Sequence, residues 1–131
     1  MKLLLDTHAA VWFYVADPQL TAGASAAIID PTNEKWVSPA SYWKMAIKIS
    51  NGKWVIAQPF EDFWHGAIKL NAFRVLHILP THAAAVAALP FPPNDHRDPF
   101  DRLIVAQAMV EGMTVISADQ KLDAYGISRI W

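Results

Sequence analysis

Short continuous blocks of hydrophobic residues alternate with longer periodic ones along the chain. Leu3–Leu5 and Thr114–Ser117 are brief, mostly apolar runs, which are typical of parallel strands covered on both faces. Similar runs predict strands at 35–37, 74–79 and 128–130. Apolar positions at helical spacing predict helices over 7–15, 22–29, 40–49, 60–70, 81–89 and 99–111, with a last helical turn at 120–125. This alternation predicts a single α/β domain over residues 1–131 with a mainly parallel sheet.

Two of the predicted helices begin with strong local signals. Ser38-Pro39 places a capping hydroxyl before a proline at the first helical position. Asp98-Pro99-Phe100-Asp101 has the same form, with an acid at the third helical position as in a capping box. In the 60–70 helix, Phe63, Ala67 and Leu70 share one apolar face. We therefore expect a buried helix there and well-defined starts at the other two.

Composition narrows the class of protein. The chain has 131 residues, of which 53% are hydrophobic and 18% charged, and this is too apolar for a disordered chain. It has no cysteine, which excludes disulfides, zinc fingers and thiol nucleophiles. The net charge of −1 indicates that any nucleic acid must be bound by a local basic patch. No apolar run approaches the ~20 residues of a membrane span, and Asp6 comes too early for a signal-peptide core. A soluble cytoplasmic protein is expected.

Four aspartates are the candidate chemistry. Asp6 and Asp119 follow predicted strands, and ligands of parallel sheets bind beyond the carboxyl ends of the strands. Asp98 and Asp101 lie three positions apart on one face of the longest helix. Carboxylates that converge repel each other, and a hard cation such as Mg²⁺ or Mn²⁺ relieves that repulsion. Such a metal can activate water and stabilise the oxyanions of phosphodiester cleavage.

Each aspartate also has a purely structural interpretation. Asp6 could cap the helix that follows it, and Asp119 could be an ordinary turn residue. Asp101 could complement the helix dipole, whereas for Asp98 the capping role is favoured. Spacing alone leaves the first three cases open.

A family resemblance adds to this interpretation. The chain resembles the PIN-domain ribonucleases, specifically the VapC-type toxins of toxin–antitoxin pairs. The resemblance rests on Leu4–His8, Val37–Trp43, Lys48–Lys53, His96–Arg102 and Ser117–Asp119, in this order. It implies a parallel five-stranded sheet flanked by helices and a Mg²⁺- or Mn²⁺-dependent endoribonuclease that hydrolyses RNA. It also implies a cognate VapB-like antitoxin and a homodimer. By this likeness Asp6, Asp101 and Asp119 are catalytic metal-binding positions, with Asp98 adjacent as a further metal position.

Lys44 departs from the family pattern. In the family a glutamate directly follows the tryptophan, whereas here Trp43 is followed by a lysine. The replacement removes a ligand and adds a positive charge, so it should weaken cation binding. The ammonium could neutralise the aspartates, bind an RNA phosphate or extend into solvent. A second interpretation follows: a catalytically inactive PIN-fold protein that binds antitoxin or RNA without cleaving it.

Basic residues beside the aspartates are candidates for binding the substrate. Arg102 and Arg97, together with Lys44, could form the local basic patch that contacts RNA phosphates, although the net charge of the chain is −1. His8 and His96 adjoin the acidic positions; a structural hydrogen bond is favoured for both over general-base chemistry.

The six tryptophans are expected mainly in the core or in an interface. Several aromatic residues lie in the first half of the chain, where the family resemblance implies that an antitoxin docks, among them Trp12, Phe13, Trp43, Trp54 and Trp64. An apolar groove that accepts an amphipathic antitoxin helix is the corresponding hypothesis, which concerns Trp12, Trp54 and Trp64 in particular. A phosphotransferase that uses Asp6 as a nucleophile is disfavoured, because His8 stands where a second aspartate would be needed.

Overall fold

A parallel sheet of five strands forms the centre of the protein, with strand order β3-β2-β1-β4-β5. The computed structural model describes residues 1–131. Every neighbouring pair of strands is parallel, which confirms the predicted sheet. The strands are β1 (Lys2–Leu5), β2 (Glu34–Val37), β3 (Arg74–Val75), β4 (Thr114–Ile116) and β5 (Arg129–Ile130).

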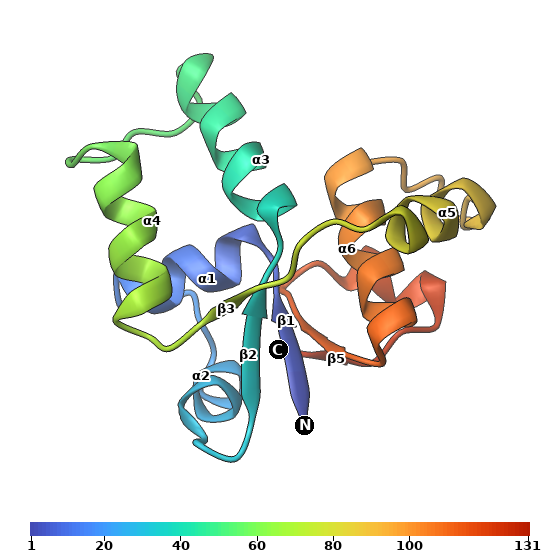
Figure 1. Cartoon of the computed structure of the whole chain (residues 1–131), viewed down its shortest axis with the longest axis horizontal. Coiled ribbons are helices and arrows are strands. Elements are labelled where there is room, and N and C mark those ends of the chain that lie inside the picture. The colour runs from blue at the N-terminus through green and yellow to red at the C-terminus, as the bar shows by residue number, and fades with distance from the viewer.

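Helices cover both faces of the sheet, in two groups (Figure 1). The helices are α1 (Thr7–Tyr14), α2 (Ala22–Ile29), α3 (Pro39–Ser50), α4 (Phe60–Lys69), α5 (Pro80–Ala88) and α6 (Pro99–Glu111), followed by the 3₁₀ helix η1 (Gln120–Tyr125). Leu3 and Leu5 pack in the hydrophobic cluster under α1, α3 and α4, whereas Leu4 packs in a second cluster under α6. Because β1 is buried on both faces from Leu3 onward, these three positions are all apolar.

Two sequence predictions needed correction. The strand predicted at 74–79 ends at Val75. Its neighbour β2 ends at Val37, and the last hydrogen bond between the two segments runs from the Leu76 N–H to the Val37 carbonyl. Beyond this point β2 offers no further partner. Leu70 was expected on the buried face of α4, but it is the C-cap residue and is 79% exposed. The apolar residue Leu70 keeps the helical spacing of Phe63 and Ala67, but α4 already ends at Lys69.

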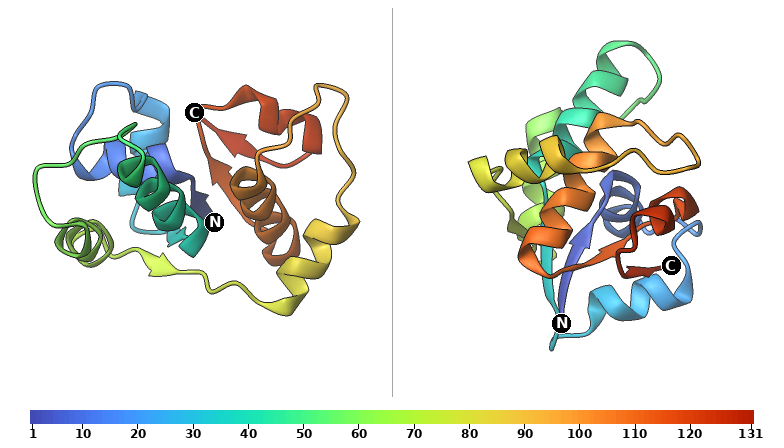
Figure 2. Two further views of the ribbon diagram at one scale, coloured as in Figure 1. Left: turned by 90° about the horizontal axis from the view of Figure 1, so that it is seen from above. Right: turned by 90° about the vertical axis from the view of Figure 1, so that its right-hand side faces the viewer.

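The sheet order brings the ends of β1 and β4 together. These strands are neighbours at the point where the strand order reverses, which is where parallel sheets form ligand sites. The helices α3 and α6 stand on either side of this edge (Figure 2). No helix of the protein is both long and apolar enough to cross a membrane.

Candidate active site

Three of the four predicted acidic residues converge on one cavity, whereas Asp98 does not line it. Asp6, Asp101 and Asp119 line a space of about 270 Å³ at the carboxyl ends of β1 and β4. The other lining residues are His8, Trp12, Lys44 and Ala118. Side chains from both ends of the sequence therefore meet in one small polar cleft.

Asp6 combines the two roles that the sequence left open. It is the N-cap of α1, and its Oδ1 accepts from the Ala9 N–H at 2.8 Å, while its carboxyl lines the cavity. Burial raises the pKa of this carboxyl to about 6, although hydrogen bonds from Ser117 and the Ala9 N–H act to lower it. The nearby charge of Asp101 raises the pKa further, and that of Lys44 lowers it. Asp6 is thus a half-buried acid, and the burial of its carboxyl disfavours the negative charge more than these contacts favour it.

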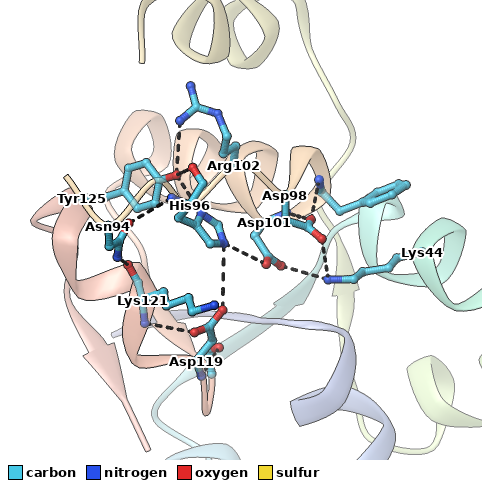
Figure 3. Close-up of polar contacts among 11 residues, drawn as sticks. Lys44, Asn94, His96, Asp98, Asp101, Arg102, Asp119, Lys121 and Tyr125 are labelled. Atoms are coloured by element: carbon cyan, nitrogen blue, oxygen red, sulfur yellow. Dashed lines mark hydrogen bonds and ion pairs between the residues drawn. The ribbon is translucent and has the colours of Figure 1, made fainter. Parts of the chain in front are cut away.

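Asp98 and Asp101 have different tasks at the start of α6. Asp98 caps the helix, because its Oδ1 accepts from the N–H groups of Phe100 and Asp101 at 2.9 and 3.0 Å. This confirms the capping role favoured for it. Asp101 instead lines the cavity, and both of its carboxylate oxygens have partners (Figure 3). Its Oδ1 accepts from Lys44, and its Oδ2 lies 3.2 Å from His96 Nε2.

The Lys44 ammonium points into this acidic group. Its Nζ lies 3.2 Å from Asp101 Oδ1 and 3.4 Å from Asp98 Oδ2, and the side chain is 15% exposed. Burial acts to lower the pKa of Lys44, but the charges of Asp101 and Asp98 outweigh it, so that the pKa is raised. Of the three predicted possibilities, the structure shows the lysine neutralising aspartates and not extending into solvent.

His96 links the remaining members of the cluster. Its Nδ1 lies 2.8 Å from the Tyr125 hydroxyl, and its Nε2 lies 3.2 Å from Asp101 and 3.9 Å from Asp119. Candidate ligand atoms of His96, Asp101 and Asp119 all lie within 4.8 Å of one another. The predicted hydrogen bond of His96 is confirmed, but its place between two site carboxylates was missed. The only sequence signal was its position five residues before Asp101.

Comparison with known proteins shows to which family this chain belongs. The family model described as PIN domain matches residues 3–127. The chain belongs to the PIN-domain family. It is 31% identical over 125 residues to "Ribonuclease VapC22" of Mycobacterium tuberculosis, a match covering 94% of this chain and 91% of that protein. The resemblance drawn from the motifs is confirmed.

Solved structures share the fold of this PIN domain. VapBC-1 from nontypeable Haemophilus influenzae matches with a TM-score of 0.67 and 17% identity over 98% of this chain and 96% of that one. VapBC2 from Rickettsia felis, bound to a DNA fragment from its promoter, matches with a TM-score of 0.70 and 14% identity over 98% and 97%. FitAcB from Neisseria gonorrhoeae matches with a TM-score of 0.64 and 18% identity over 97% and 95%.

Of the two arginines predicted to contact RNA, Arg97 lies at the surface and Arg102 does not. Arg102 was predicted to contact RNA, but it is 6% exposed and its guanidinium donates to the carbonyls of Leu89 and Pro90. The prediction that Arg102 contacts RNA is wrong, because its side chain points into the protein and is bonded to backbone carbonyls there. Arg97 is 60% exposed, pairs with Asp95 and remains available at the surface.

An aromatic group borders the acidic cavity of the PIN domain. The His8 ring lies between Trp12 and Trp54, with centroids at 5.1 and 5.2 Å, and Lys48 Nζ lies 5.8 Å from the Trp54 ring. Burial and the charges of Lys48 and Lys44 lower the pKa of His8. Trp12 and Trp54 also line an adjoining, mostly apolar cavity of about 410 Å³. Trp64, expected in the same groove, is 5% exposed and belongs to the core.

The donor set of the acidic cavity fits a hard divalent cation. Mg²⁺ and Mn²⁺ prefer carboxylate oxygens, and the cavity offers three carboxylates from separate elements. Lys44 compensates the charge at Asp98 and Asp101, where α6 begins. Asp6 and Asp119 make no ion pair with this ammonium, so their carboxylate oxygens could bind a cation without displacing Lys44.

Proposed function

We propose that this protein is a metal-dependent endoribonuclease of the VapC type, which hydrolyses RNA phosphodiester bonds and is neutralised by a cognate antitoxin. The observation that carries the proposal is the convergence of Asp6, Asp101 and Asp119 on one cavity. The similarity to a VapC ribonuclease over nearly the whole chain supports the reaction class.

The site residues divide the work of binding and orientation. Asp6 and Asp119 would hold Mg²⁺ or Mn²⁺, with Asp101 beside them. The bound ion would supply an activated water and positive charge for the phosphodiester oxygens. With a pKa of about 6, Asp6 is mainly ionised at neutral pH and is ready to act as a ligand. His96, anchored by Tyr125, fixes the orientation of Asp101.

Substrate and partner would approach from different sides of the cavity rim. The exposed Arg97 is the remaining arginine candidate for a phosphate contact, so RNA binding should weaken with salt. The apolar cavity beside Trp12 and Trp54 suits an amphipathic antitoxin segment. Similarity to the structures of VapBC-1 and FitAcB supports such a partner. The homodimer and the cytoplasmic location stay predictions from the family resemblance.

A cleavage assay on end-labelled single-stranded RNA tests the proposal. The wild-type protein should cut with Mn²⁺ and not with EDTA, and Asp119→Asn should lower the rate by about 100-fold, or ~3 kcal/mol in the barrier. Asp30→Asn is the control, because Asp30 accepts a local N–H from Thr32 at the end of α2 and lines neither the acidic nor the apolar cavity. Equal cleavage by Asp119→Asn, or cleavage in EDTA, would exclude this mechanism.

The ion pairs of Lys44 favour a second candidate, a PIN-fold protein that binds antitoxin or RNA without cutting. Absence of cleavage in excess Mn²⁺, with cleavage gained in Lys44→Glu, would select this candidate. Cleavage by the wild-type protein would reject it.

A further inference from the structure

We infer that Lys44 is a tethered counter-cation, which stabilises the metal-free acidic site and competes with a divalent cation for Asp101. The inference deepens the proposed function and rests on its metal site. It concerns how strongly the site binds metal, and it can be tested without RNA.

The position of the ammonium is the first argument. It reaches from α3 to the first turn of α6 and contacts Asp101 and Asp98 together, at 3.2 and 3.4 Å (Figure 3). A divalent cation that used Asp101 Oδ1 would have to share this oxygen with the ammonium or displace it. The other oxygen, Oδ2, already lies 3.2 Å from His96 Nε2. Asp101 therefore has no carboxylate oxygen without a nitrogen partner.

The packing around Lys44 holds it in place. Its neighbour Trp43 meets Phe100 of α6 edge-on, with ring centroids 5.8 Å apart, and Met45 on its other side is fully buried. These contacts fix the backbone of α3 beside the start of α6. The ammonium is thus preorganised at the carboxylates, and a solvated lysine at the same position would not be.

Charge gives the third argument. Without Lys44, Asp98 and Asp101 would lose the ammonium they share, and Asp6 and Asp119 line the same cavity as Asp101. Of these carboxylates, only those of Asp101 and Asp119 lie close to His96, at 3.2 and 3.9 Å from its Nε2. The ammonium relieves part of the repulsion between these carboxylates in the absence of metal. The same positive charge repels a divalent cation that enters the cavity. One side chain therefore stabilises the empty site and weakens metal binding.

Removal of the charge separates the two effects. Lys44→Gln keeps a long polar side chain without the ammonium, and Lys44→Glu restores the acid found in the family pattern. Lys48→Gln is the matched control: it removes the same charge one turn later on α3, where the ammonium lies near Trp54 and has no carboxylate partner.

Mn²⁺ affinity, measured by calorimetry or by the electron paramagnetic resonance of free Mn²⁺, is the main readout. Lys44→Gln should bind Mn²⁺ about tenfold more tightly than the wild-type protein, and Lys44→Glu more tightly still. In EDTA, Lys44→Gln should unfold at a lower temperature than the wild type, and Mn²⁺ should raise that temperature more than it does for the wild type. Lys48→Gln should change the affinity far less than Lys44→Gln does, because the Lys48 ammonium contacts no carboxylate of the site.

Equal Mn²⁺ affinity of the wild type and Lys44→Gln would overturn the inference and leave the metal site of the proposed function intact. A loss of RNA binding by Lys44→Gln in EDTA with unchanged Mn²⁺ affinity would also overturn it, in favour of a phosphate contact. Failure of every protein, Lys44→Glu included, to bind Mn²⁺ would overturn both the inference and the metal requirement.

Discussion

Replacement of Asp6 by asparagine should stabilise the metal-free protein while destroying its metal site. Asparagine caps helices about as well as aspartate, so the hydrogen bond from the Ala9 N–H to the side chain can persist. What disappears is a negative charge in a partly buried position. The substitution therefore isolates the cost of that charge from the cost of the cap.

The magnitude follows from the pKa of Asp6, which burial raises from 3.8 to about 6 in the folded protein. Between these values the folded state binds more protons than the unfolded chain, so the free energy of unfolding falls as pH rises. This contribution is fully present below pH ~4 and is lost as pH rises through about 6. The shift of about two pKa units corresponds to at most ~3 kcal/mol above pH 7. Asparagine does not ionise, so Asp6→Asn does not lose this free energy of unfolding as pH rises.

Thermal unfolding in EDTA, monitored by circular dichroism at pH 4 and pH 7.5, checks the prediction. Asp6→Asn should exceed the wild-type Tm by about 3–8 °C at pH 7.5 and by little at pH 4. Asp98→Asn is the comparison variant and should change the Tm in the opposite direction. Asp98 also caps a helix, but hydrogen bonds and the charge of Lys44 outweigh burial and lower its pKa. Its charge stabilises the fold above the unfolded pKa, so Asp98→Asn should lower the Tm at pH 7.5.

A lower Tm for Asp6→Asn at pH 7.5 would show that the Asp6 charge stabilises the fold, which refutes the argument from burial. An equal gain at both pH values would show that the effect does not come from ionisation. An unchanged Tm for Asp98→Asn would refute the claim that Lys44 stabilises the acidic site through that carboxylate.

Three further predictions concern the packing and the partner surface. Arg102→Met should lower the free energy of unfolding in urea by about 2–3 kcal/mol, because the carbonyls of Leu89 and Pro90 lose a charged donor that is itself buried. Unchanged stability would refute the claim that these hydrogen bonds stabilise the fold. Gly66→Ala should lower the free energy of unfolding by about 1–3 kcal/mol in the same assay, because the added Cβ would collide with the Tyr14 hydroxyl. This clash outweighs the gain in helix propensity of about 1 kcal/mol. Trp12→Ala and Trp54→Ala should each weaken binding of the cognate antitoxin by about tenfold or more in a fluorescence titration; undiminished binding by both variants would place the antitoxin elsewhere.

Local sequence signals predicted most of the elements. Ser38 and Asp98 begin their helices as expected, because a capping side chain bonds to N–H groups two or three residues away and needs no distant partner. The parallel sheet followed from the continuous apolar run at Leu3–Leu5, since these three residues of β1 are buried on both faces of the sheet. The family motifs added the expectation that Asp6, Asp101 and Asp119 would meet.

The sequence by itself determined where strands and helices begin, which residues cap them and which acids follow the strands, because these features depend on neighbours along the chain. Only the tertiary structure decided the direction of the long polar side chains. Lys44 and Asp101 are separated by 57 positions, and they pair because α3 and α6 pack beside the same edge of the sheet. The inward turn of Arg102 and the bridging position of His96 likewise depend on loops and helices brought together by folding. An ammonium or guanidinium on a flexible stem can reach several partners, and the surrounding packing determines which partner it meets.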